Sequence, residues 1–188
     1  MTINQVPKNW PNNLIFLKRN EIDKRLQQSV LIVPETVLKT LSLVGKDQQC
    51  LGICKLVQIK KIQDPKHPAN GEFGLFSLKT IPPKTYILDY KGVITSEEYA
   101  SQASDYILHF DGEYSIDAQW KGNEARFLND YRGIQAKQDV QFQLYRDSDS
   151  IVHMGVFSIK EIKKGQEICI NYGKGFWKNR GVDLAADR

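Results

Sequence analysis

The spacing of apolar residues near the N-terminus predicts two helices. A rough helical stripe and a capping asparagine, Asn12 or Asn13, predict the first helix over residues 12–30. Its apolar positions are Leu14, Leu17, Ile22 and Leu26. Pro34 suits the first turn of a second helix, which Gly45 would end. Its apolar positions are Val37, Leu38, Leu41 and Val44.

The pattern becomes strand-like after residue 48. Val57 and Ile59 alternate with polar neighbours within Gln48–Gln63, and the Pro- and Asn-rich stretch Asp64–Gly71 predicts a loop. Short strands are then expected at residues 73–78, 86–90, 92–95, 106–110, 114–117, 140–146, 151–158 and 166–170. Brief helices are expected only at residues 96–102 and 123–128. Many short strands without a long amphipathic helix favour a mostly β domain.

Charge is distributed unevenly along the chain. The 188 residues include 26 Lys and Arg and 22 Asp and Glu, for a formal net charge of +4. This length fits one domain, or one domain with an appended arm. Residues 1–69 carry +6 and residues 70–188 carry −2, and Asp89–Asp130 alone carries −6. The acidic stretch could attract a basic peptide, although a solvated acidic face is the alternative.

Several classes of protein are excluded by what the sequence lacks. Its apolar runs are far short of the roughly 20 residues of a membrane span, and its start does not have the pattern of a secretory signal. Three cysteines, Cys50, Cys54 and Cys169, cannot form a disulfide framework, which favours a reducing compartment. A closed zinc site needs four ligands, and the histidines are scattered. We therefore expect buried thiols and no metal site.

Three separated stretches carry motifs in a fixed order. Residues 71–94 read GEFGLFSLKTIPPKTYILDYKGVI, residues 105–133 contain GNEARFLN, and residues 156–177 contain GQEICINYG. Together they resemble the SET domain, the fold of protein-lysine methyltransferases, over roughly residues 55–177. The forms HPANGEFGLF, NDYRG and NYGKGFW are most similar to small fungal SET proteins that methylate histone H3. The resemblance implies a mostly β (α+β) fold of short sheets in a β-clip-like arrangement, with a short helical N-terminal extension.

The resemblance also implies methyl transfer from S-adenosylmethionine to the ε-amine of a lysine. Tyr172 matches the tyrosine beside the transferred methyl group, where its hydroxyl can orient the amine. Asn129 matches the asparagine that holds the cofactor, and Trp177 is hypothesised to cover it. Arg126 could instead pair with a nearby acid, and Tyr106 could belong to the core. The other expected cofactor-binding residues are Phe73, Gly74, Leu75, Tyr106, Arg126, Phe127 and Asp130.

A narrow apolar channel is implied for the substrate lysine. Such a channel favours the neutral amine by desolvation. Its expected lining residues, for each of which burial in an ordinary core is the alternative, are Tyr90, Phe142, Ile170 and Phe176. A tyrosine hydroxyl in the channel can limit members of this family to one methyl group. Because neither Phe142 nor Ile170 carries a hydroxyl, we predict dimethylation or trimethylation.

The sequence departs from the family pattern at three places. Glu72 replaces the first glycine of G-x-G, or that glycine is shifted to Gly71, and Asp130-Tyr131-Arg132 replaces the usual His-Ser-Cys. The cysteine-rich tail that closes many SET active sites with zinc is absent after Tyr172. We hypothesise that Phe176 and Trp177 pack over the cofactor instead, or that a second subunit of a homodimer closes the site.

The expected function is methylation of a lysine on a histone tail, with histone H3 as the first candidate. We expect an N-terminal extension over residues 1–47, the SET domain with its preceding strand over 48–177, and a tail over 178–188. Expected partners are the histone tail or nucleosome, with weak DNA contact through the basic N-terminal part and no membrane. The nucleus is the expected location, with the cytoplasm as a second one. The alternatives are a catalytically silent histone- or DNA-binding module and a methyltransferase of a non-histone protein.

Overall fold

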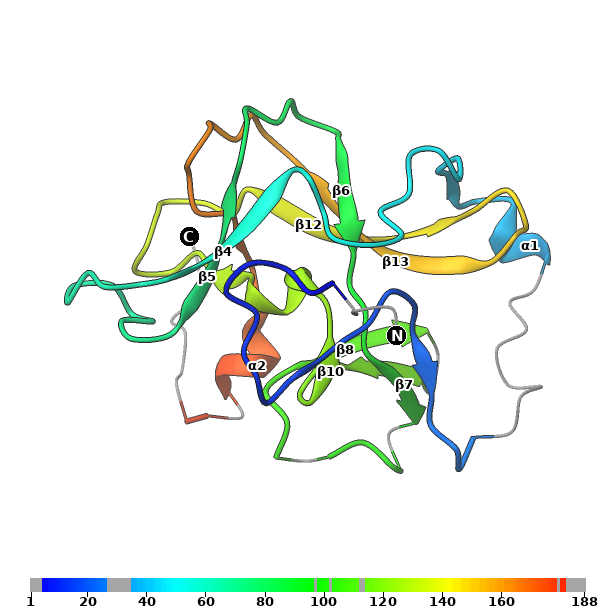
Figure 1. Ribbon diagram of the computed structural model, residues 1–188. Helices are drawn as coiled ribbons and strands as arrows, with labels where there is room; N and C mark the ends of the chain where they lie inside the picture. The colour runs from blue at the N-terminus through cyan, green and yellow to red at the C-terminus, as the bar shows by residue number, and fades with distance from the viewer. Residues whose placement is uncertain are drawn as a thin grey trace.

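The computed structural model describes residues 5–26, 35–96, 98–101, 103–111, 114–178 and 180–181. Short β-strands dominate this part of the chain, as the sequence predicts, and they form five small sheets (Figure 1). The helices among these residues are brief: α1 spans Glu35–Leu38, the 3-10 helix η2 spans Glu124–Phe127, and α2 spans Lys174–Lys178. None of them is long and apolar enough to cross a membrane.

The first four-stranded sheet is built on a long hairpin of β12 (Val140–Arg146) and β13 (Val152–Ser158). Strand β3 (Ser42–Leu43) runs parallel to β12, and β6 (Tyr86–Asp89) runs antiparallel to β13. Asp147 stabilises the hairpin turn, because its Oδ1 accepts the backbone N–H groups at residues 149 and 151, each at 2.9 Å. The hairpin extends across the molecule towards α1 (Figure 1).

The second four-stranded sheet has the order β2-β7-β9-β8. Its strands are β2 (Glu21–Ile22), β7 (Val93–Ser96), β9 (Tyr114–Asp117) and β8 (Ile107–Asp111). Strands β7, β9 and β8 pair antiparallel, whereas β2 adds to β7 in parallel. An N-terminal strand therefore forms one edge of this sheet.

Three two-stranded sheets connect distant parts of the chain. Strands β4 (Val57–Lys61) and β5 (Phe73–Ser77) form an antiparallel pair, and the buried side chains alternate along β4 as expected. Strand β1 (Ile15–Phe16) runs parallel to β10 (Lys121–Gly122). Strand β11 (Asn129–Asp130) runs parallel to β14 (Cys169–Ile170), so the second and third motif stretches lie side by side.

One hydrophobic cluster joins these sheets into a common core. Its fully buried members include Leu75, Leu88, Ile116 and Val156 from three of the sheets, and Ile168 directly before β14. Because each small sheet is too short to bury its own apolar face, the sheets are stable only when packed together.

The predicted helix over residues 12–30 is wrong for its described part, residues 12–26. This segment forms β1 and β2, and the backbone N–H groups of Ile15 and Leu17 donate to the carbonyls of Trp120 and Gly122 at 3.0 and 2.7 Å. Sheet pairing with distant strands overrides a weak helical stripe, because it satisfies the same backbone groups and buries Leu17 as well. Residues 27–30 lie outside the described part of the chain.

Two other helix predictions also need correction. Among the described residues the second helix spans only Glu35–Leu38, and Pro34 lies outside them. Strand β3 follows because the backbone at Ser42–Leu43 pairs with β12. Residues 96–102 form a turn among their described members, with N–H of Ala100 bonded to the carbonyl of Ser96. The 123–128 helix is confirmed as η2, and most predicted strands match within two residues. The strand predicted at 166–170 shortens to β14.

Candidate active site

Two adjoining cavities lie where the motif stretches meet. A narrow cavity of about 100 Å³ and a wide cavity of about 590 Å³ share Asp105, Tyr106, Arg126 and Tyr172 in their walls. A small molecule in the wide cavity and a side chain inserted into the narrow cavity could therefore meet at Tyr172. The arrangement suits a reaction between a bound small molecule and an inserted side chain.

Tyr172 is held at the end of β14 by two contacts. Its backbone N–H donates to Oδ2 of Asp130 at 2.8 Å, and its hydroxyl donates to the carbonyl of Leu128 at 2.7 Å. The parallel pairing of β11 with β14 creates this arrangement, because it brings both acceptors beside the tyrosine. Burial of the hydroxyl end, followed by the charge of Asp130, raises the pKa of Tyr172 well above its ordinary value. The phenol is therefore neutral at physiological pH.

All four residues predicted for the channel line the narrow cavity. These residues are Tyr90, Phe142, Ile170 and Phe176. Phe142 meets Tyr90 edge to face, with ring centroids 5.3 Å apart, and the Tyr90 hydroxyl donates to the carbonyl of Tyr106 at 2.8 Å. Burial raises the pKa of Tyr90. The cavity wall is thus mainly apolar, and the hydroxyls of Tyr90 and Tyr172 already donate hydrogen bonds within the protein.

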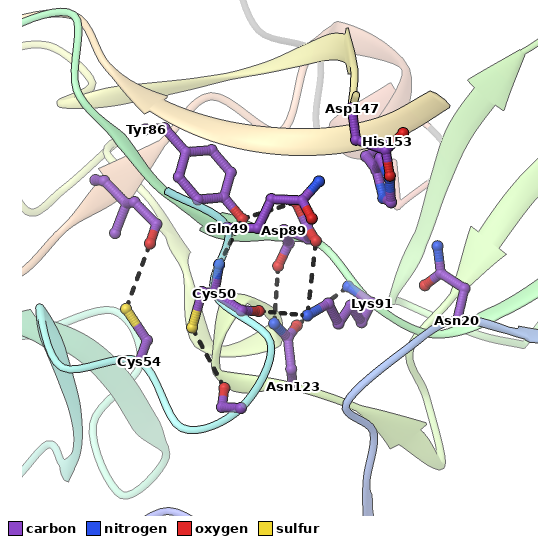
Figure 2. Close-up of polar contacts among 12 residues, drawn as sticks. Asn20, Gln49, Cys50, Cys54, Tyr86, Asp89, Lys91, Asn123, Asp147 and His153 are labelled. Atoms are coloured by element: carbon purple, nitrogen blue, oxygen red, sulfur yellow. Dashed lines mark hydrogen bonds and ion pairs between the residues drawn. The ribbon is translucent and has the colours of Figure 1, made fainter. Parts of the chain in front are cut away.

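A buried polar cluster includes the two neighbours of Tyr90 in the chain, and Figure 2 shows its residues Tyr86, Asp89, Lys91 and Asn123. Asp89 accepts hydrogen bonds from the hydroxyls of Tyr86 and Tyr145 at 2.9 and 2.7 Å, and it lies 3.6 Å from Nζ of Lys91. Asn123 donates to the carbonyl of Asp89 at 2.8 Å and accepts the backbone N–H of Lys91 at 3.1 Å. These bonds fix the backbone on both sides of the channel tyrosine at position 90. They also fix the start of η2.

Five of the residues predicted to bind the cofactor line the wide cavity. They are Phe73, Tyr106, Arg126, Phe127 and Asn129. The other four predicted residues, which do not line it, are Gly74, Leu75, Asp130 and Trp177. Leu75 is fully buried in the core, and Asp130 contacts the Tyr172 backbone from behind the cavity.

Arg126 places a buried positive charge beside both cavities. Its Nε and Nη2 donate to the carbonyls of Ala118 and Gln119 at 3.0 and 3.3 Å, and its guanidinium carbon lies 4.0 Å from the Tyr106 ring centroid. Arg126 is only 9% exposed, yet no carboxylate of the described residues forms an ion pair with it. The alternative of a structural acid partner is therefore not supported within the described part of the chain. A buried cation of this kind favours an anionic ligand.

Asn129 is oriented by a network that sequence reasoning missed. Its Nδ2 donates to Oε1 of Glu167 at 2.8 Å and to the carbonyl of Phe73 at 3.3 Å. The other oxygen of Glu167 lies 2.9 Å from Nε2 of His67, whose Nδ1 accepts the backbone N–H of Ala69 at 3.0 Å. Nε2 therefore carries the ring proton and donates to Glu167. Glu167 lies within the GQEICINYG motif, and this position was the one sequence feature that could have indicated its role near the site.

Gly74 also has a structural role that the sequence did not suggest. The sequence suggested that a missing side chain lets the backbone approach a cofactor. In the structure, a Cβ at this position would lie 2.7 Å from Oε1 of Glu167 and 3.2 Å from Nδ2 of Asn129. A side chain at position 74 would therefore press on the hydrogen-bonded pair of Glu167 and Asn129.

Helix α2 places aromatic residues against Tyr172. The ring centroids of Phe176 and Trp177 lie 4.5 and 6.5 Å from that of Tyr172, and the Trp177 indole N–H donates to Asp130 at 3.4 Å. Arg180 stacks on Phe176 and forms an ion pair with Asp105. Phe176 thus closes part of the narrow cavity, whereas Trp177 braces Tyr172 and Asp130.

The cysteines lie apart from both cavities. Cys54 and Cys169 are buried, and Cys50 is half-buried. The interaction between the two neighbouring thiols lowers the pKa of Cys50 and raises the pKa of Cys54. Within the described part of the chain, no group of three or more metal-ligating side chains is placed to hold a metal ion.

Some lining residues of the wide cavity were not predicted from the sequence. Glu72 and Trp120 lie inside the motif stretches, so the SET resemblance could have indicated that they are near the site. Pro11, Asn13 and Leu14 precede the resemblance, and nothing in their local pattern indicated a binding role.

Comparisons with known proteins agree with this geometry. Human histone-lysine N-methyltransferase EHMT1 is 29% identical over 123 residues, which cover 58% of this chain and 9% of that protein. Histone-lysine N-methyltransferase Set2 of Drosophila melanogaster is 33% identical over 112 residues, covering 53% of this chain and 4% of that protein. The chain therefore spans less than a tenth of the length of these curated relatives.

A solved structure supports the fold. ctPRC2 in an autoinhibited conformation bound to S-adenosylmethionine superimposes with a TM-score of 0.54 at 22% identity, over 69% of this chain and 16% of that chain. The SET domain family model matches residues 72–173, which include η2, Asn129 and Tyr172. Because this match covers more than half of the sequence, the chain belongs to the SET-domain family.

Proposed function

We propose that this chain is an S-adenosylmethionine-dependent protein-lysine N-methyltransferase that acts on a histone tail. The observation that carries the proposal is the meeting of a wide and a narrow cavity at Tyr172 in a SET-family chain. The wide cavity would hold the cofactor, and the narrow cavity would admit the lysine. Tyr172 would orient the lysine amine at the point where the two cavities meet.

The residues of the wide cavity fit the proposed cofactor. Its volume of about 590 Å³ lies within the usual range for small-molecule sites. Buried Arg126 has no carboxylate partner among the described residues, so it suits the α-carboxylate of an amino-acid group. Phe73, Asn129 and Phe127 provide apolar and amide surface for the nucleoside. When bound, S-adenosylmethionine supplies an activated methyl group.

The chain's own residues would prepare the substrate lysine for methylation. The apolar walls of the narrow cavity, formed by Phe142, Ile170 and Phe176, lower the pKa of an inserted amine by desolvation and favour its neutral form. The Tyr172 hydroxyl donates its hydrogen bond to the carbonyl of Leu128, so its oxygen remains available as an acceptor where the two cavities meet. These acceptors can orient the amine in line with the methyl group.

The histone substrate is supported by the names of the relatives. EHMT1 and Set2 are both called histone-lysine N-methyltransferases, and their matched segments cover 58% and 53% of this chain. Histone H3 is proposed as the target on the resemblance to small fungal SET proteins. A nuclear location follows from a histone substrate. We keep the division into an extension over 1–47, a SET domain over 48–177 and a tail over 178–188 as part of this proposal.

A labelling experiment tests the proposed function. The protein and its Tyr172→Phe variant are incubated with methyl-labelled S-adenosylmethionine and recombinant histones or nucleosomes. We expect label on one histone and a decrease of about a hundredfold or more in the variant, because the orienting oxygen is lost. Mass spectrometry then identifies the modified lysine.

The alternatives give different results in the same experiment. Histone binding without transfer would indicate a catalytically silent module. Transfer only to other proteins of an extract would indicate a non-histone methyltransferase. Equal transfer by the wild type and the Tyr172→Phe variant would contradict the assigned role of Tyr172.

A further inference from the structure

The N-terminal segment, defined here as residues 7–17, is fixed on both sides of the wide cavity. On one side, Asn9 donates from Nδ2 to the carbonyl of Ile59 in β4 at 2.7 Å. On the other side, Ile15–Phe16 pairs with β10. Between these anchors, Trp10 is buried and meets Phe127 edge to face, with ring centroids 5.6 Å apart. The segment is therefore part of the body that forms the site.

The middle of this segment forms a wall of the wide cavity. Pro11, Asn13 and Leu14 line it together with Gln119 and Trp120. All three segment residues precede residue 72, where the family match begins. They therefore add to the site a wall that the family match does not include.

The positions of charge and aromatic groups indicate which part of the proposed cofactor this wall would contact. The reacting sulfonium has to lie near Tyr172, where the two cavities meet. Arg126 suits the α-carboxylate, and its guanidinium is bonded to the backbone at Ala118 and Gln119, directly before Trp120. The backbone of Trp120 in turn accepts the N–H of Ile15 at 3.0 Å. The amino-acid arm would therefore extend towards the N-terminal segment.

Two amide side chains of this wall are available for a ligand. Neither Asn13 nor Gln119 uses its side-chain amide in a hydrogen bond with another described residue. An amide offers both a donor and an acceptor, which match the carboxylate and ammonium groups of an amino acid. We infer that Asn13 is a specificity-determining residue that binds the amino-acid arm of S-adenosylmethionine. This inference rests on the proposed function.

Binding measurements on the full chain test this inference without relying on activity. Isothermal titration calorimetry gives the affinity for S-adenosylmethionine. Competition against labelled S-adenosylmethionine gives the affinity for 5′-methylthioadenosine, which lacks the amino-acid arm. The variant is Asn13→Ala, and the matched control is Asn12→Ala, because Asn12 is also exposed but does not line the cavity. Equal melting temperatures of the two variants verify that both are folded.

The expected pattern is selective for the amino-acid arm. Asn13→Ala should bind S-adenosylmethionine about tenfold more weakly than the wild type does, because a hydrogen bond to a charged group is lost. It should bind 5′-methylthioadenosine as tightly as the wild type does. Asn12→Ala should match the wild type for both ligands. Unchanged S-adenosylmethionine affinity in Asn13→Ala, or an equal loss for both ligands, would overturn the inference. Absence of S-adenosylmethionine binding by the wild type would instead refute the proposed function and the inference with it.

Discussion

Tyr172 illustrates how a short motif and the fold contribute differently to one residue. The GQEICINYG motif predicted its position, and the structure adds the bond from its hydroxyl to the carbonyl of Leu128. That acceptor lies 44 positions away in the sequence and becomes a neighbour only through the pairing of β11 with β14. The motif predicted which residue carries the hydroxyl, and the fold determines which carbonyl accepts its hydrogen bond.

The number of methyl groups transferred is a property of individual channel residues. Phe142 and Ile170 line the narrow cavity without a hydroxyl, and the hydroxyls of Tyr90 and Tyr172 already donate to backbone carbonyls. We expect the wild type to form dimethyl-lysine or trimethyl-lysine. Phe142→Tyr should shift the product towards monomethyl-lysine, because a new hydroxyl can hold the amine or a water beside Tyr90.

Mass spectrometry of a product peptide after long incubation measures this shift. Phe142→Leu is the control, since it changes the volume of the side chain without adding a hydroxyl. Only monomethyl-lysine from the wild type, or identical products from both variants, would contradict the prediction.

Among the secondary-structure elements, helix α2 differs from the hypothesised lid over the cofactor, because only one of its two aromatic residues lines a cavity. Phe176 lines the narrow cavity, as expected of a channel residue. Trp177 lines neither cavity and instead bonds to Asp130, which holds the backbone of Tyr172. Trp177 thus supports Tyr172 through Asp130. The amino-acid composition of α2 does not reveal this contact.

Replacement of Trp177 tests this support. Trp177→Ala should weaken S-adenosylmethionine binding by about fivefold, because Asp130 loses a donor and the Tyr172 ring loses a stacked neighbour. Calorimetry measures the affinity, and Lys178→Ala on the same helix is the control. An unchanged affinity of Trp177→Ala would show that α2 does not support the site.

The N-terminal elements show where local patterns fail. The apolar positions between Leu14 and Leu26 fit a helix, yet the described residues form β1 and β2. Their partners are far away in the sequence, since Lys121 pairs with Ile15 and Val93 pairs with Glu21. A local pattern therefore cannot reveal the pairing that stabilises these strands. In contrast, the hairpin β12–β13 and strand β9 were predicted well, because clear alternation and turn residues accompany them.

At the scale of the whole molecule, folding divides the acidic stretch between interior and surface. Asp89, Glu124 and Asp130 are buried, and Asp130 pairs with Arg132. Burial raises the pKa of Glu124, whose Oε1 accepts the backbone N–H of Cys54 at 2.8 Å. A sequence charge of −6 therefore overstates the negative surface offered to a basic peptide.

The buried Asp89 cluster carries a prediction for stability. Asp89→Ala should lower the free energy of unfolding by about 3 kcal/mol or more, because Lys91 keeps a buried charge and the two tyrosine hydroxyls lose their acceptor. Urea denaturation followed by circular dichroism measures this loss. Asp89→Asn should lose less, since its amide oxygen still accepts from the tyrosines.

Glu98→Ala is the matched control, because Glu98 is an exposed acid of the same stretch. It should change the free energy of unfolding by no more than about 0.5 kcal/mol. Equal losses from Asp89→Ala and Glu98→Ala would contradict the structural role of the cluster.

Sequence patterns were enough to predict the mostly β class, the SET resemblance and four residues that line the narrow cavity, namely Tyr90, Phe142, Ile170 and Phe176. These features are encoded locally, in strand alternation and in short sequence motifs with restricted residue types. Three features became visible only in the tertiary structure: the N-terminal wall of the wide cavity, the Glu167–Asn129 pair beside Gly74, and the burial of acids from the acidic stretch. Each of these depends on backbone pairing or burial between segments far apart in the chain, and such energies are absent from any local pattern.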